Sequence, residues 1–129
     1  MNDNKNLDDF LPKKDAIYYK SFEIKSISKK ILKNDVIEKI KKVFDPEIPV
    51  NIYDLGLIYN LEIDQINNIN IKMTLTTPNC PVAGIMPQKV GEAVSDLEEI
   101  SSVKVELVWY PKWTKDMMSD DAKLALDIV

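Results

Sequence analysis

The chain has 129 residues, a hydrophobic fraction of 45% and a formal net charge of −4, which fit one globular domain with a single core. It contains one cysteine and no histidine, and all 17 positive charges are lysines. These absences exclude a histidine-based catalytic triad, histidine metal ligands, an intramolecular disulfide and bidentate arginine clamps on phosphate.

The charge is unevenly distributed. Residues 1–34 carry eight lysines against five acidic residues, and the remainder carries nine lysines against sixteen. We interpret residues 1–34 as a lysine-rich, partly disordered N-terminal extension and residues 35–129 as the folded domain. An acidic domain is a poor match for nucleic acid. No window offers the ~18 apolar residues of a membrane span and no signal-peptide pattern is present, so we expect a cytoplasmic protein without a membrane partner.

Taken in chain order, the segment 16–32 lacks a clear hydrophobic period and leaves strand and helix open. Apolar residues then recur at helical spacing over 35–44, which predicts an amphipathic helix. Asp35 and Glu38 stand at capping-box spacing at its start, and Pro46 is expected to end it.

A β-hairpin is predicted next. The dense apolar run 57–63 indicates a strand covered on both faces, and residues 65–68 are typical of a turn. Strict alternation over 69–76 then indicates a half-buried strand, antiparallel to the first.

The rest of the chain predicts helix, strand and helix. The second helix runs from Pro81 to about Glu98, with a kink or break expected at Pro87. A third strand covers 103–109, and Ser119 or Asp120 starts a short final helix. The economical arrangement is an α+β domain with a three-stranded mixed sheet packed against helices.

Polar side chains gather at the two proline-marked corners that flank the hairpin. A hairpin returns the chain to where it left, so we expect these corners to be neighbours in space. The candidate site residues are Asp45, Glu47, Asp54, Thr76, Thr77 and Cys80. Each acid alone is more often a turn former, but three acids beside a thiol could bind a metal or act as bases.

Cys80 lies at the expected start of the second helix, where free backbone N–H groups favour a thiolate. The three acids expected nearby would disfavour the thiolate, and the sequence leaves open which effect is larger. A thiolate suits iron, zinc or sulfur chemistry and nucleophilic attack, whereas a small buried core residue is the competing interpretation. Iron–sulfur clusters normally take four ligands, mostly cysteines. A monomer with one thiol could therefore only share a cluster, within a homodimer or with another protein.

Three blocks carry a resemblance to a known family: DPEIPVNIYDLGLIY (45–59), TLTTPNCPVAG (74–84) and WYPKW (109–113). The chain resembles the SufT/PaaD-like iron–sulfur cluster assembly family, most closely its SufT branch, from Asp35 to the C-terminus. The resemblance implies a domain similar to the C-terminal domain of NifU-type scaffolds. It implies the same candidate site, with Asp54 in support. Where NifU-type domains carry Cys-x-x-Cys, this sequence has Thr77-Pro78-Asn79-Cys80, which argues against an independent scaffold.

The resemblance implies an accessory factor in iron–sulfur cluster maturation that assists insertion or transfer of clusters to client proteins. Its partners would be other assembly proteins and client apoproteins, and its cofactor a transient cluster or iron held through Cys80, not a tightly bound group. Two alternatives stay open. One is a cysteine-dependent enzyme that handles persulfide or thioester, with an acid such as Asp45 as base. The other is an interaction adaptor that binds partners through Trp109 and Trp113.

Overall fold

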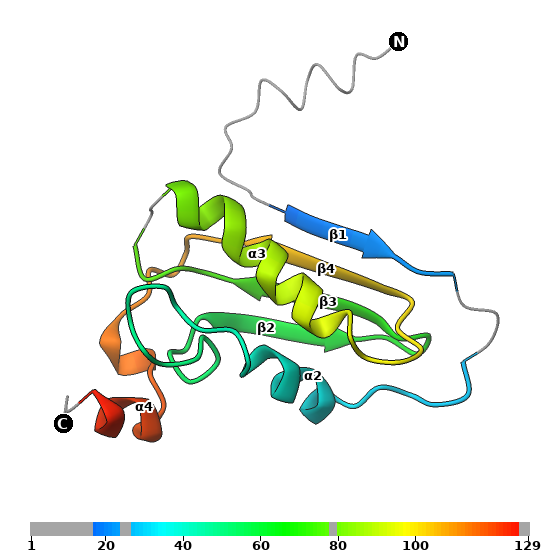
Figure 1. Cartoon of the computed structure of the whole chain (residues 1–129), viewed down its shortest axis with the longest axis horizontal. Coiled ribbons are helices and arrows are strands. Elements are labelled where there is room, and N and C mark those ends of the chain that lie inside the picture. The colour runs from blue at the N-terminus through cyan, green and yellow to red at the C-terminus, as the bar shows by residue number, and fades with distance from the viewer. Residues whose placement is uncertain (1–16, 24–26, 78–79, 127–129) are drawn as a thin grey trace, which may run out of the picture.

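The computed structural model describes residues 17–23, 27–77 and 80–126, without the side chains of residues 80–84. Residues 1–16, the first part of the extension expected to be partly disordered, lie outside the described residues. One mixed sheet of four strands in the order β1-β4-β3-β2 forms the centre of the domain (Figure 1). Its strands are β1 (Ile17–Ser21), β2 (Ile58–Ile63), β3 (Asn68–Met73) and β4 (Ser102–Leu107).

The α+β class is confirmed, but the prediction of three strands is wrong. The fourth strand is β1, which pairs antiparallel with β4 along its whole length, from Ile17 opposite Glu106 to Ser21 opposite Ser102. It comes from the segment in which the sequence leaves strand and helix open. Four of its five side chains are exposed, so β1 lacks the hydrophobic alternation that identifies a strand.

The hairpin β2–β3 is antiparallel as predicted, and β3 pairs with β4 in parallel. β2 is an edge strand in which only Leu61 is buried, so the prediction of cover on both faces is wrong. Asn67 closes the hairpin turn in a left-handed conformation (φ 63°).

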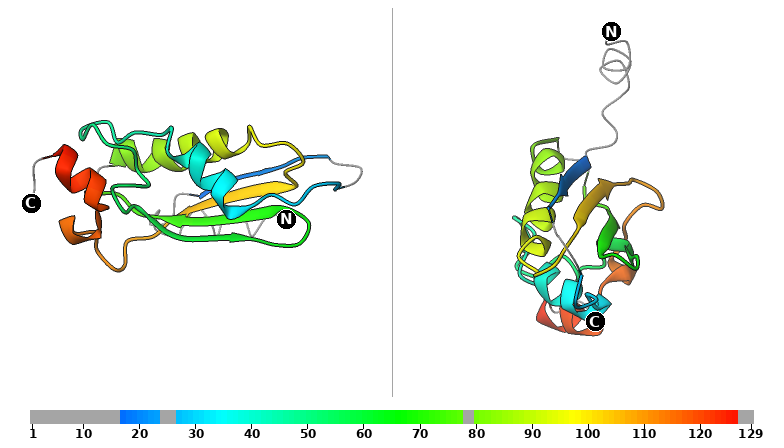
Figure 2. Two further views of the ribbon diagram at one scale, coloured as in Figure 1. Left: turned by 90° about the horizontal axis from the view of Figure 1, so that it is seen from below. Right: turned by 90° about the vertical axis from the view of Figure 1, so that its right-hand side faces the viewer.

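Helices α2 (Lys33–Ile40) and α3 (Cys80–Val94) pack on one face of the sheet, as Figure 2 shows from two further sides. The core between the two layers includes Ile40, Ile69, Ile71, Met73, Val90, Val103 and Val105. The opposite face of the sheet bears polar side chains such as Asn70 and Lys72. Among the described residues, no helix is long and apolar enough to cross a membrane.

Both ends of α2 differ from the prediction. Leu32, not Asp35, is the N-cap of α2, and Asp35 accepts the backbone N–H of Leu32 at 3.2 Å. α2 ends at Ile40, before Pro46, because the next residues tighten into turns in which Val43 N donates to Ile40 O. α3 continues through Pro87 without a break. The final helix α4 (Asp120–Ala125) is confirmed, with Ser119 as its N-cap.

Candidate functional site

The open end of the hairpin places the two predicted corners at the same end of the sheet. Ile58 pairs with Met73, and the N–H of Thr74 donates to the carbonyl of Leu57 at 2.8 Å. The loop 43–57 before β2 and the start of α3 after β3 consequently lie at the same end of the sheet (Figures 1 and 2). The expectation that the outer ends of the hairpin are neighbours is confirmed.

Asp45 folds the first corner. Its carboxylate is buried and accepts the backbone N–H groups of Glu47 at 2.8 Å and Ile48 at 3.0 Å. This is the turn that an aspartate before a proline favours. The carboxylate of Asp45 is therefore engaged by the loop itself, while Glu47 is exposed.

Asp54 holds the second half of the same loop. Its carboxylate accepts the side-chain amide of Asn51 at 2.8 Å, and its own N–H donates to Asn51 Oδ1 at 2.9 Å. Its carbonyl accepts the N–H of Ser119 at 2.8 Å, which ties the loop to the start of α4. Asp54 thus supports the corner by fixing its backbone.

The aromatic turn packs against this corner. Trp113 Nε1 donates to the carbonyl of Leu55 at 2.7 Å, and the Tyr59 hydroxyl donates to the carbonyl of Pro111 at 2.7 Å. Burial raises the pKa of Tyr59. Trp109 and Trp113 are partly buried against the core, whereas Tyr110 is 88% exposed. The contacts of Trp113 explain its place in the fold without a docking partner.

Thr76, Thr77 and Cys80 follow β3 in the second corner. Thr76 is partly buried and Thr77 is exposed. Cys80 is the first residue of α3, so its backbone occupies the helix N-terminus as the sequence predicts. The helix dipole there favours a thiolate. The side chain of Cys80 lies outside the described part of the chain, so its contacts with the loop 43–57 stay a prediction.

Within the described side chains, no three carboxylate or thiol groups stand together in a way that could hold a metal ion. Asp45, Glu47 and Asp54 therefore do not form a metal site by themselves. A site that combines one of them with the thiol of Cys80 stays a prediction.

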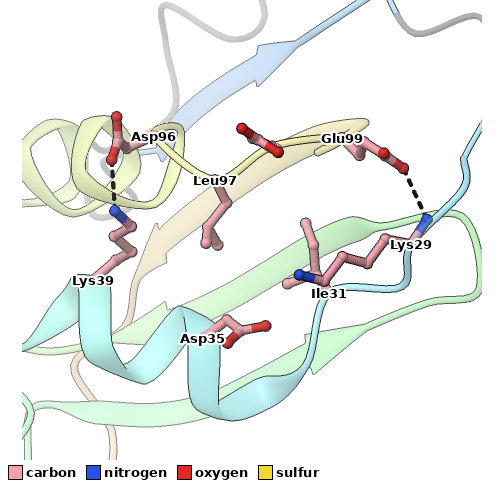
Figure 3. A pocket seen from close by; sticks show the side chains of 8 residues that line it. Lys29, Ile31, Asp35, Lys39, Asp96, Leu97 and Glu99 are labelled. Atoms are coloured by element: carbon pink, nitrogen blue, oxygen red, sulfur yellow. Dashed lines mark hydrogen bonds and ion pairs between the residues drawn. The ribbon is translucent and has the colours of Figure 1, made fainter.

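A polar pocket of about 340 Å³ lies elsewhere, between the segment 29–35, α2 and the connection from α3 to β4 (Figure 3). Lys39 Nζ contacts Asp96 Oδ2 at 2.5 Å, and this hydrogen bond lowers the pKa of Asp96. The pocket adjoins the C-terminal end of α3. Cys80 is at the opposite end of this helix, which has 15 residues and is about 22 Å long. It is separate from the predicted site.

Two residues next to this pocket anchor the N-terminal segment, and sequence reasoning missed both. The fully buried side chain of Asn67 accepts the N–H of Ile31 and donates to the carbonyls of Lys29 and Glu99, each at 2.9 Å. The carboxylate of Glu99 accepts the N–H groups of Ser28 at 2.7 Å and Lys29 at 2.9 Å. The one signal was the asparagine in a predicted turn, since asparagine tolerates a left-handed backbone.

Comparison with known proteins identifies the family. The model of a family described as iron-sulfur cluster assembly protein matches residues 33–107, more than half of the chain. The chain belongs to this family. The prediction of a SufT/PaaD-like family is thereby confirmed.

Individual relatives agree with this assignment. The chain is 45% identical over 92 residues to an Fe-S protein maturation auxiliary factor of Porphyromonas gingivalis, covering 71% of this chain and 88% of that protein. It is 40% identical over 86 residues to the Fe-S protein maturation auxiliary factor SufT of Staphylococcus aureus, covering 67% and 98%. The crystal structure of a domain of unknown function, DUF59, from Bacillus anthracis superimposes with a TM-score of 0.69 at 38% identity, covering 74% of this chain and 92% of that one.

Proposed function

We propose that this chain is an accessory factor in the maturation of iron–sulfur proteins, which assists the insertion or transfer of clusters into client proteins. One observation carries the proposal: the chain spans 88% and 98% of relatives that bear the name of Fe-S maturation auxiliary factor. The match therefore covers nearly the whole of those proteins and is not confined to one domain of a larger protein.

Removal of the chain from its cells tests this role. The iron and sulfide content of client iron–sulfur proteins should fall, while the amount of each client polypeptide stays the same. Re-expression of the wild-type chain should restore the content. Unchanged cluster occupancy in all clients would contradict a maturation role.

Cys80 is the residue through which we expect the chain to handle iron or a cluster. It is the only thiol in the chain, and its position at the start of α3 favours the ionised form that ligates metal. One thiol is too few for a conventional cluster site. In this proposal the cluster is a substrate in transit, and the remaining ligands come from an assembly protein, a client apoprotein or a second copy of this chain.

The loop 43–57 would then form the wall of the site. Asp45 and Asp54 fix the backbone of that loop through the hydrogen bonds described above, while Glu47 is exposed beside it. We place this activity in the cytoplasm, where thiols stay reduced. Glu47→Gln should leave the free energy of unfolding unchanged, because the side chain of Glu47 is exposed.

A further inference from the structure

β1 precedes residues 33–107, the part of the chain that matches the family model. It covers the outer edge of β4 by antiparallel pairing of five residues. Four of its side chains are exposed, and only Tyr18 is partly buried. β1 is therefore held by its backbone and by the ring of Tyr18, and the adjoining Phe22 packs against the core and donates its N–H to the carbonyl of Ser101 at 2.8 Å.

Gly91 in α3 makes room for that ring. A Cβ atom at Gly91 would lie 2.0 Å from Cδ2 and 2.2 Å from Cε2 of Tyr18. Glycine is unfavourable inside a helix, so its presence here matches the close approach of Tyr18. The edge of β4 and the gap over Gly91 together form a site for an extended strand with one aromatic side chain, which we call the strand slot.

We propose that the strand slot binds an extended segment of a partner polypeptide that carries an aromatic residue in the place of Tyr18, and that β1 occupies the slot in cis. Exposed sheet edges bind peptides through backbone hydrogen bonds, and a side-chain pocket supplies the specificity. β1 itself shows that the slot accepts this kind of segment.

The attachment of β1 permits its exchange. Only two side chains of the segment 17–23, Tyr18 and Phe22, pack against the core, so its departure uncovers less apolar area than the loss of a central strand would. The chain behind it stays fixed independently, since Ile31 is buried and its N–H is bonded to Asn67 at 2.9 Å. The inference that the partner takes part in iron–sulfur maturation rests on the function proposed above. The strand slot itself does not depend on that function, because β1, β4 and α3 alone define it.

A labelled peptide of residues 17–23, titrated into the full-length chain, tests the slot without any iron–sulfur readout. Tyr18→Ala weakens the cis strand, so this variant should bind the peptide on the order of tenfold more tightly than the wild type, because more molecules have an open slot. Tyr19→Ala is the matched control: Tyr19 is 60% exposed, and this variant should bind like the wild type.

The double variant Tyr18→Ala/Gly91→Ala separates the slot from general loosening. Alanine is a better helix former than glycine, and the ring that would clash with its Cβ is absent, so the double variant should fold. It should bind no peptide, because the new methyl group fills the gap. Equal affinity in the wild type and Tyr18→Ala, or binding retained in the double variant, would overturn the proposal.

Amide hydrogen exchange of the wild type gives a second measurement that needs no variant. The amides of β1 should exchange through local opening, faster than those of β3 in the middle of the sheet. Exchange of β1 only through global unfolding would show that β1 is a permanent strand, and would overturn its role as a replaceable occupant.

Discussion

Asn67 joins the segment 29–31 to the hairpin turn and to the connection before β4. Its side chain is fully buried and makes three hydrogen bonds at 2.9 Å, while its backbone is left-handed. Asn67→Gly keeps the backbone conformation accessible but leaves the N–H of Ile31 and two carbonyls without their partner. We expect the free energy of unfolding to fall by about 2–3 kcal/mol, measured by urea denaturation. Asn70→Gly, in the exposed row of β3, is the control, and an equal loss there would contradict the assignment.

Gly56 also joins two segments of the chain, at the end of the molecule where the candidate site lies. Its φ is +83°, and a Cβ there would lie 2.2 Å from the carbonyl oxygen of Met117. Gly56→Ala should therefore separate the loop 43–57 from the C-terminal segment and cost about 1–3 kcal/mol. The measurement is the midpoint of thermal unfolding. A midpoint equal to that of the wild type would show that this contact does not hold the corner.

At the scale of the elements, we expect the attachment of the segment 27–31 to make the free energy of unfolding depend on pH. Hydrogen bonds lower the pKa of Glu99. The largest contribution comes from the Ser28 hydroxyl, and the backbone N–H groups of Lys29 and Ser28 add to it. A lowered pKa means that the stabilisation is complete above the ordinary glutamate value of about 4.3 and is lost as the pH falls through the folded value. Glu99→Gln should thus be less stable than the wild type at neutral pH.

The difference between Glu99→Gln and the wild type should shrink below about pH 4. Urea midpoints measured at several pH values give the comparison. Glu98→Gln removes the same formal charge from an exposed neighbour and should change little. A constant difference between wild type and Glu99→Gln over the acidic range would contradict the anchoring role of the carboxylate.

At the scale of the whole molecule, the sequence predicted the elements that bury an apolar face. The alternation of β3, the period of α2 and the cap of α4 are short-range patterns, and all three elements exist. β1 was not predicted because backbone pairing with β4 and the contact of Tyr18 with Gly91 join residues far apart in the chain. Such contacts leave no local period.

The candidate site was predictable to the same degree. Its location follows from the hairpin, and Cys80 does begin a helix. The sequence favoured a turn-forming role for Asp45 and Asp54 taken singly, and the loop hydrogen bonds show that role. It could not decide against a ligating role, because a turn-forming aspartate and a ligating one have the same residue type. The two ends of α3 lie in different surroundings: one begins with Cys80, and the other adjoins the anchored segment 27–31.

Anaerobic reconstitution with iron and sulfide tests the central claim most directly. Wild type and Cys80→Ser, shown by thermal unfolding to be equally folded, are treated in parallel and examined by visible absorption and sizing. The account predicts cluster absorbance that depends on Cys80 and appears in a dimer, or in a complex with an added client apoprotein. Equal absorbance in both proteins, or none in either with client present, would contradict the role of Cys80 as a ligand.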